Sequence, residues 1–176
     1  MPADTTDMTD TTIDTSVFRD AFASLPTSVA VITTTDSQGT PKGLTSNAVC
    51  AVSMDPPLLL ICVDKSSRTL PALQQANGFV VNFLSESAEH VSRQFATKRG
   101  DKFAGVQHRT SSRAAGSPIL FADSVAYLEC AAASRIEAGD HWILLGRVLG
   151  GEVHDRGALL YHRRSYLKLL PERNAL

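Results

Sequence analysis

The chain has 176 residues, which suits one domain with a single core. Its 43% hydrophobic and 20% charged residues are the ordinary balance of a globular protein. A net charge of −1 gives no support to a nucleic-acid partner, and no apolar run approaches the ~20 residues that cross a membrane. We therefore expect neither a nucleic-acid partner nor a membrane association.

Residues 1–15 are rich in threonine and aspartate and contain no lysine or arginine. A secretory signal would need a basic start and an apolar stretch. We expect a flexible leader over residues 1–15, one domain over residues 16–172, and a cytoplasmic location.

The three cysteines, Cys50, Cys62 and Cys130, lie in apolar runs and form no CxxC pair. An odd number of cysteines without metal-binding spacing favours neither a disulfide framework nor a zinc site. We predict three buried, reduced thiols and no metal site.

The first predicted element is a helix that ends before Pro26, with N-cap oxygens available at residues 14–16. Its apolar residues recur at helical spacing and are Val17, Phe18, Ala21, Phe22 and Leu25. This pattern predicts an amphipathic helix that packs one face on the core.

Strands follow the helix. The first four are predicted at residues 28–35, 40–47, 48–54 and 58–63. A turn at residues 36–39, where Gly39 can take a positive φ, joins the first two as a hairpin. The run at 58–63 is continuously apolar, which predicts a strand buried on both faces.

The second half is predicted to hold more strands, helices near residues 69–76 and 86–97, and a long loop over 98–118. Ser85 is the expected cap of the longer helix, with Ala88, Val91 and Phe95 turned inward. The further strands are predicted at residues 78–84, 125–136 and 141–153, with a turn at 139–140 and bulges at 146 and 150–151.

Many strands, short turns and few helices favour a mainly β fold, a closed or nearly closed antiparallel barrel. Strands and helices do not alternate regularly, which disfavours a doubly wound parallel sheet. The chain also lacks GxGxxG, so a nicotinamide coenzyme would not be held in a Rossmann cradle.

Four polar segments are candidates for chemistry, and each has a plain structural alternative. Residues 43–48 allow close approach to the backbone, or form an ordinary polar strand. Residues 62–69 suit a phosphate or polyol, or cap the next helix. Residues 95–103 carry three cations for a phosphate or for a helix C-terminus. Residues 139–144 hold a turn histidine that is either merely exposed or orients a substrate.

Taken in order, these segments resemble the short-chain flavin reductase family, the reductase components of two-component flavin-dependent monooxygenases. The resemblance runs from about Phe18 to Leu169. Its marks are FxxLPTxVAVIT at 22–33, GLTSNA at 43–48, VSMDPPL at 52–58, LICV at 60–63 with Ser66-Ser67, Phe95-Ala96, and His141 within Gly-Asp-His. Each motif is weak alone, but their order is specific.

The resemblance implies a split β-barrel FMN-binding fold, a Greek-key antiparallel barrel with a few peripheral helices. It also implies a homodimer with flavin sites near the subunit interface. The implied flavin contacts are Thr45, Ser46, Asn47, Ala48, Cys62, Val63, Asp64, Lys65, Ser66, Ser67, Phe95, Lys102 and Phe103. The implied nicotinamide side is Pro26, Thr27, Ser28, Gly139, Asp140 and His141, with His141 as the catalytic candidate that positions the nicotinamide.

Two positions depart from the family pattern. Ser28 stands where a glycine often follows Pro-Thr, and Ser46 stands where alanine is common. The first bears on the geometry of the nicotinamide side, and the second on one flavin contact.

The implied activity is an NAD(P)H:flavin oxidoreductase that reduces FMN or FAD by hydride transfer and supplies reduced flavin to a partner monooxygenase. The sequence does not separate FMN from FAD, or NADH from NADPH. One alternative is an FMN-binding electron-transfer or carrier protein without nicotinamide turnover, since one fold hosts several functions. An oxidase resembling the pyridoxamine-phosphate type fits the motif order less well.

Overall fold

The computed structural model describes residues 13–98 and 100–169. Three helices lie within these ranges: α1 (Thr15–Ala23), α2 (Leu70–Gln75) and α3 (Glu89–Ala96). The strands are β1 (Thr27–Ser28), β2 (Ala30–Thr35), β3 (Pro41–Ser46), β4 (Val49–Met54), β5 (Pro57–Asp64), β6 (Gly78–Leu84), β7 (Arg109–Thr110), β8 (Pro118–Ile119), β9 (Ser124–Ala138), β10 (His141–Val153), β11 (Leu159–His162) and β12 (Ser165–Lys168).

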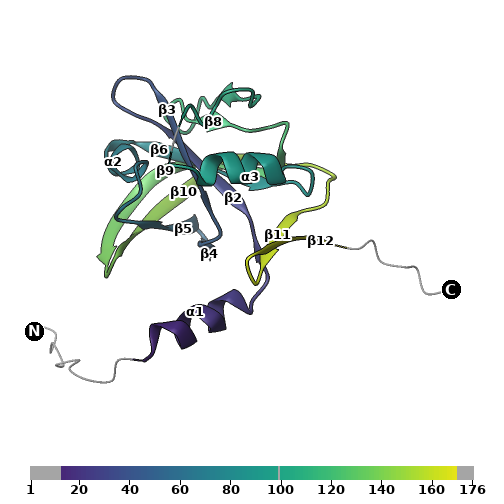
Figure 1. Cartoon of the computed structure of the whole chain (residues 1–176). Helices are drawn as coiled ribbons and strands as arrows, with labels where there is room; N and C mark the ends of the chain where they lie inside the picture. Colours follow the sequence, from purple (N-terminus) through teal and green to yellow (C-terminus); the bar gives the residue numbers. More distant parts are fainter. Residues whose placement is uncertain (1–12, 99, 170–176) are drawn as a thin grey trace, which may run out of the picture.

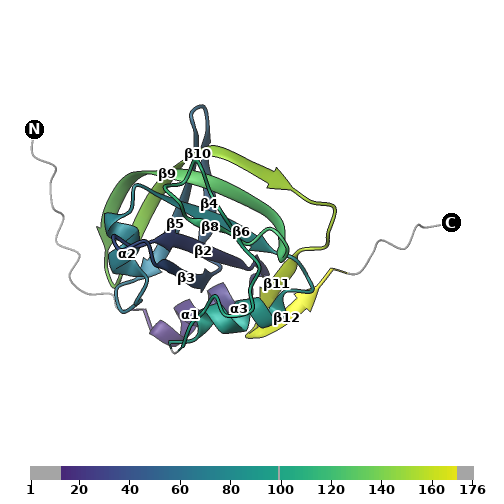
Figure 2. The ribbon, with the colours of Figure 1, turned by 90° about the horizontal axis from the view of Figure 1, so that it is seen from above.

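Seven strands form one antiparallel sheet in the order β3-β2-β6-β9-β10-β5-β4. The sheet curls into a barrel that stays open between β3 and β4, and a small β1-β11-β12 sheet lies at one side (Figures 1 and 2). The predicted split β-barrel with peripheral helices is therefore confirmed. The predicted hairpin turn at Gly39 (φ +78°) and the bulges at Gly146 and Gly150 are also confirmed.

The barrel encloses a core that includes Ile32, Ile61 and Phe79. A second cluster lies under α3, where Ala88, Val91 and Phe95 are fully buried, as their spacing predicted. The predicted start of this helix is wrong, because α3 begins at Glu89 after Ala88. Ser85 instead forms a β-bridge with Ala158, so its backbone belongs to the sheet and not to a helix cap.

Strand β5 alternates along its length. Leu59, Ile61 and Val63 are buried, whereas Leu58, Leu60 and Cys62 are only half-buried. The prediction that this strand is buried on both faces is wrong, because within one chain nothing described covers its outer face as the barrel interior covers its inner face. A continuous apolar run does not say which face is covered.

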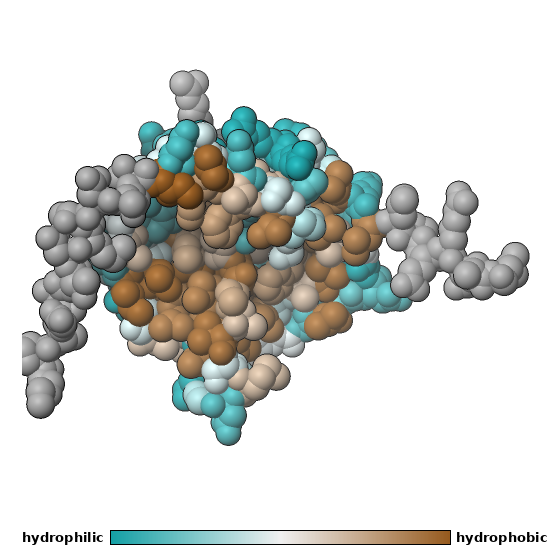
Figure 3. Space-filling view, turned by 90° about the horizontal axis from the view of Figure 1, so that it is seen from below, coloured by the Kyte–Doolittle hydropathy of each residue, from teal (hydrophilic) through white to brown (hydrophobic). Residues whose placement is uncertain are grey.

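Helix α1 begins as predicted, with the Asp14 carboxylate accepting a hydrogen bond from the Ser16 N–H at 2.8 Å. The prediction that it packs on the core is wrong, because none of its residues is buried. Phe18 is 57% exposed and Phe22 is 62% exposed. Figure 3 shows the molecule from below the view of Figure 1, and hydrophobic residues cover much of this side.

The cysteines differ in their surroundings. Only Cys130 is buried; Cys62 is half-buried and Cys50 is exposed on β4. The prediction of three buried thiols is therefore wrong for Cys50 and Cys62, which face the uncovered side of their strands. All three thiols are free.

Two sequence-based boundaries fall partly outside the description. Residues 1–12 of the predicted leader and residues 170–172 of the predicted domain lie outside the described ranges. Among the described residues, no helix is long and apolar enough to span a bilayer.

Candidate functional site

The end of β3 and the two residues that follow it carry three of the predicted polar side chains, Thr45, Ser46 and Asn47. Thr45 donates its hydroxyl to the carbonyl of Ser92 on α3 (2.7 Å). Asn47 donates from Nδ2 to the Thr27 hydroxyl (3.1 Å). The carbonyl of Ala48 accepts from the N–H of Cys62 (3.0 Å), which joins this segment to the end of β5. The residues around the barrel opening are therefore held by three different elements.

The loop after β5 forms a compact polar turn. The Ser66 N–H donates to the Asp64 carboxylate at 2.6 Å and holds the pKa of that carboxyl below its usual value. Ser67 donates its N–H to the Asp64 carbonyl at 2.9 Å. Lys65 is engaged elsewhere, because its ammonium pairs with Glu137 at 2.6 Å. Val63 turns its side chain into the core and can offer a ligand only backbone atoms.

The end of α3 is braced against β3. Phe95 is fully buried and meets Phe103 edge-on, with ring centroids 4.9 Å apart. The Lys102 ammonium donates to the carbonyls of Gly43 (3.0 Å) and Phe95 (2.8 Å). Burial lowers the pKa of Lys102, and the charge of Arg68 lowers it further. Lys102 thus joins the predicted segments 43–48 and 95–103.

These three segments line one groove of about 230 Å³. Its lining residues are Leu44, Thr45, Asp64, Ser66, Ser67, Arg68, Phe95, Ala96, Thr97, Lys98 and Lys102. Arg68 and Lys98 are additions to the predicted site residues. The sequence did point to both residues, since each belongs to a polar segment that was selected partly for its cations. The Arg68 guanidinium is fixed by a hydrogen bond to the Lys98 carbonyl.

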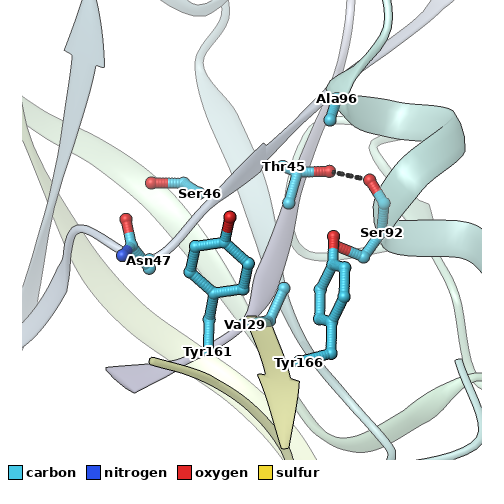
Figure 4. A pocket seen from close by; sticks show the side chains of 8 residues that line it. All are labelled: Val29, Thr45, Ser46, Asn47, Ser92, Ala96, Tyr161 and Tyr166. Carbon is cyan, nitrogen blue, oxygen red and sulfur yellow. Dashed lines mark hydrogen bonds between the residues drawn. The ribbon is translucent and has the colours of Figure 1, made fainter. Parts of the chain in front are cut away.

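A second pocket adjoins this groove and shares Thr45 and Ala96 with it. Figure 4 shows Tyr161 and Tyr166 of the β11-β12 hairpin forming one wall, opposite the residues that end β3. The two rings meet edge-on at 5.1 Å, and the Tyr166 hydroxyl lies 2.9 Å from Ser92 Oγ. Sequence reasoning missed both tyrosines. Only their spacing across a turn could have signalled that they face the same way.

The Gly139-Asp140-His141 segment forms the tip of the β9-β10 hairpin, and Gly139 takes φ +57° there. His141 pairs in register with Asp64 of β5. Its Nδ1–H donates to the Asp140 carboxylate at 2.7 Å, and this contact holds the pKa of Asp140 below its usual value. The histidine therefore lies beside the loop that lines the first groove and is oriented by its neighbour.

The other predicted nicotinamide residues lie elsewhere in the chain. Thr27 is half-buried, pairs with Tyr161, and reaches the second pocket through Asn47, whereas Pro26 and Ser28 are exposed. Within the described residues, no hydrogen bond or ion pair joins residues 26–28 to residues 139–141. The two halves of the predicted nicotinamide side are therefore not joined directly within one chain.

The donor set fits a flavin. Hydroxyls, backbone N–H groups and the cations Arg68 and Lys98 at one end suit a phosphate and a polyol chain. The half-apolar wall continuing past Thr45 to the tyrosines suits a flat ring. No group of three or more histidine, cysteine, aspartate or glutamate residues in the described ranges could hold a metal ion.

The fold is that of a split-barrel protein, and the groove has a lining that suits a phosphorylated ring ligand. Residues 22–170 match the model of the flavin reductase like domain, so the chain belongs to that family. The chain is 41% identical over 158 residues to the flavin reductase (NADH) of Kitasatospora aureofaciens, covering 89% of this chain and 82% of the relative.

Two further comparisons find a relative that is a reductase subunit and a solved oxidoreductase. It is 36% identical to HsaB of Rhodococcus jostii (strain RHA1), the reductase subunit of a flavin-dependent monooxygenase, covering 92% of this chain and 81% of the relative. The solved NADH:FAD oxidoreductase SgcE6 of Streptomyces globisporus C-1027, in complex with NAD and FAD fragments, superposes with a TM-score of 0.85 at 33% identity, covering 92% and 96%. Two relatives from Rhizobium meliloti (strain 1021) are longer, and this chain spans 50% and 65% of them.

Proposed function

We propose that this chain is an NAD(P)H:flavin oxidoreductase that reduces FMN or FAD and supplies the reduced flavin to a partner monooxygenase. The observation that carries the proposal is the continuous surface from the cationic groove at Arg68 and Lys98, through Thr45, to the pocket at Tyr161. The relatives named above support the activity and the kind of partner.

In this proposal, Ser66, Ser67, Arg68 and Lys98 bind the flavin phosphate, and Thr45 to Ala48 line its ring. The remaining predicted contacts have different parts. Lys102 and Phe95 hold the groove in shape, because the lysine donors point to backbone carbonyls and the phenyl ring is buried. Cys62 and Val63 contribute mainly through the backbone of β5.

A bound flavin would supply the acceptor for a hydride from the nicotinamide coenzyme. The protein's part is to bring the two rings together in a fixed geometry, which is worth several kcal/mol in such reactions. In this proposal His141, which the Asp140 carboxylate orients, positions the nicotinamide. Thr27 and Ser28 would form the other side of that site.

We also propose a homodimer. The exposed apolar residues of α1 and of β4 suit an interface with a second copy of the chain. Those residues are Val17, Phe18, Phe22, Val52 and Met54, and Met54 is 89% exposed. A second copy that covers this face could also bring residues 26–28 of one subunit near residues 139–141 of the other. We place the domain at residues 16–172.

The test is steady-state NADH and NADPH oxidation with FMN or FAD added separately. We expect oxidation that depends on added flavin and saturates with it. A protein that stays yellow through gel filtration yet oxidises neither coenzyme would support the flavin-carrier alternative instead.

The role of His141 has its own test. His141→Ala should raise the KM for the coenzyme and lower kcat while the flavin dissociation constant stays near the wild-type value, because the histidine lies beyond the phosphate groove. Asp140→Asn should give a weaker change in the same direction. Unchanged kinetics in His141→Ala would remove the role given to the histidine but leave the activity standing.

A further inference from the structure

The turn between β11 and β12 has a backbone that its residues disfavour. His162 pairs with Ser165, so Arg163 and Arg164 are the two turn residues. Their φ angles are +46° and +65°. Hairpin turns with two positive φ angles strongly prefer Asn-Gly, and arginine is unfavourable at both positions. Unfavourable backbone of this kind persists mostly where the side chains serve a function.

The arginine side chains are not needed to hold the turn in place. The turn lies against the end of α1 (Figure 1), where the Arg163 N–H donates to the Ala23 carbonyl at 3.0 Å. His162 Nε2 lies 3.1 Å from the Ser24 carbonyl. A backbone donor and a histidine thus satisfy these helix-terminal carbonyls. In the described ranges, neither exposed guanidinium has a hydrogen bond or an ion pair.

The two arginines line a pocket of about 290 Å³ together with Asp20 and Ala23 of α1. Small-molecule sites usually span about 300–1,000 Å³, so this pocket suits a sugar phosphate better than a whole dinucleotide. Paired guanidinium groups are the usual protein partners of phosphate oxygens. A carboxylate can accept hydrogen bonds from the ribose hydroxyls of NAD, as it does in Rossmann folds.

The pocket lies close to the proposed nicotinamide side. Thr27 pairs with Tyr161, and Arg163 follows Tyr161 by two residues, about 7 Å along a strand. A dinucleotide with its nicotinamide near Thr27 can therefore reach the turn with its other half.

We propose that this pocket binds the adenosine-side ribose and phosphate of NADH, with Arg163 and Arg164 on the phosphate and Asp20 on the ribose hydroxyls. The inference rests on the proposed function and names the coenzyme. Because a carboxylate repels a 2′-phosphate, Asp20 disfavours NADPH and opposes the attraction of the two arginines for that group.

The first test is the double variant Arg163→Asn/Arg164→Gly, which gives the turn the residues it prefers and removes both cations. The KM for NADH should rise about tenfold, since one charge-assisted hydrogen bond is worth that much. The melting temperature should stay the same or rise. Arg147→Gln, an exposed arginine on β10, is the control and should behave as wild type. An unchanged KM in the double variant overturns the proposal.

A binding measurement separates this pocket from catalysis. Calorimetry with ADP-ribose should show about tenfold weaker binding to the double variant than to the wild type. Equal binding overturns the proposal. If the wild type oxidises no NADH with any flavin, the proposed function fails, and the ADP-ribose result still decides the pocket.

Two comparisons identify the ligand. Asp20→Asn should raise the ratio of kcat/KM for NADPH to that for NADH about fivefold, by removing the repulsion; an unchanged ratio overturns the role of Asp20. With NADH fixed, the double variant should keep the wild-type KM for FMN and for FAD. A rise for FAD alone would place the adenosine arm of the flavin in this pocket and overturn the assignment to the coenzyme.

Discussion

Two regions of the molecule differ in what fixes their shape. One is the groove lined by Thr45, Ser66 and Lys102, and the other is α1 with the β11-β12 hairpin. Around the groove, Thr69 and Lys102 both donate to the Gly43 carbonyl, and Phe95 is buried beneath it. Helix α1 buries none of its residues, and the hairpin turn holds two arginines at positive φ. One chain is therefore enough to shape the groove, whereas the other region leaves its side chains exposed.

The largest effect is expected at the groove, where Phe95 packs against Gly43. In Gly43→Ala, the added Cβ would lie 2.6 Å from Cε1 and 2.8 Å from Cδ1 of Phe95. Because Phe95 is fully buried and cannot move aside, we expect a loss of about 2 kcal/mol in the free energy of unfolding. Flavin affinity should fall with it. Urea denaturation and flavin titration measure the two effects.

A second-site change checks the cause. Adding Phe95→Leu to Gly43→Ala should recover part of the lost stability, since the smaller side chain leaves room. A Gly43→Ala protein as stable as the wild type would show that the groove is not rigidly braced.

Lys102→Met should have a smaller effect. It leaves the carbonyls of Gly43 and Phe95 without this donor, which should cost about 1 kcal/mol because the ammonium is partly exposed to solvent. Flavin should bind more weakly. Lys102→Arg, which keeps a charged donor, is the matched control. A flavin affinity that is lost equally in both variants would contradict a bracing role.

The same residue predicts a pH dependence. Burial lowers the pKa of Lys102 in the folded chain below its value in the unfolded chain. Between these two pKa values the unfolded chain binds more protons, so this residue's contribution to stability rises with pH. The unfolding free energy of the wild type relative to Lys102→Met should therefore increase as pH approaches 10.5. A relative decrease over that range would contradict the lowered pKa.

The other region should respond in assembly more than in folding. The ring centroids of Phe18 and Phe22 lie 4.9 Å apart, but both side chains remain exposed. The double variant Phe18→Ser/Phe22→Ser should be a monomer in sedimentation experiments, whereas the wild type should be a dimer. The stability of the single chain should change by no more than about 0.5 kcal/mol, as is usual at exposed sites. A wild-type protein that is already a single chain would refute the dimer.

The smallest effect concerns the reactivity of the thiols. It is best measured in the monomeric variant Phe18→Ser/Phe22→Ser, in which no second copy covers them. Cys50 is exposed and should react first with a thiol reagent at pH 8. Cys62 should react more slowly, because burial raises its pKa. Burial raises the pKa of Cys130 to about 12, so it should react only on unfolding. Cys50→Ser should remove the fast phase, and rapid labelling of Cys130 would contradict its burial.

Local patterns in the sequence determined the strands, the turns and the inward face of α3. Alternation, glycine positions and helical spacing act over a few residues, so β6, β10 and the bulge at Gly146 could be predicted from the chain alone. The motif order also determined which polar segments would meet, and three of them do line one groove.

Only the tertiary structure decided which apolar faces are covered. The outer face of β5 and the apolar face of α1 have the sequence of buried surfaces, yet one chain leaves them uncovered. The Tyr161–Tyr166 wall shares a pocket with Thr45, and the Arg163–Arg164 turn shares a pocket with Asp20. In both cases the two sides lie more than a hundred positions apart in the sequence. Burial and pocket lining depend on such distant neighbours, and a local pattern carries no information about them.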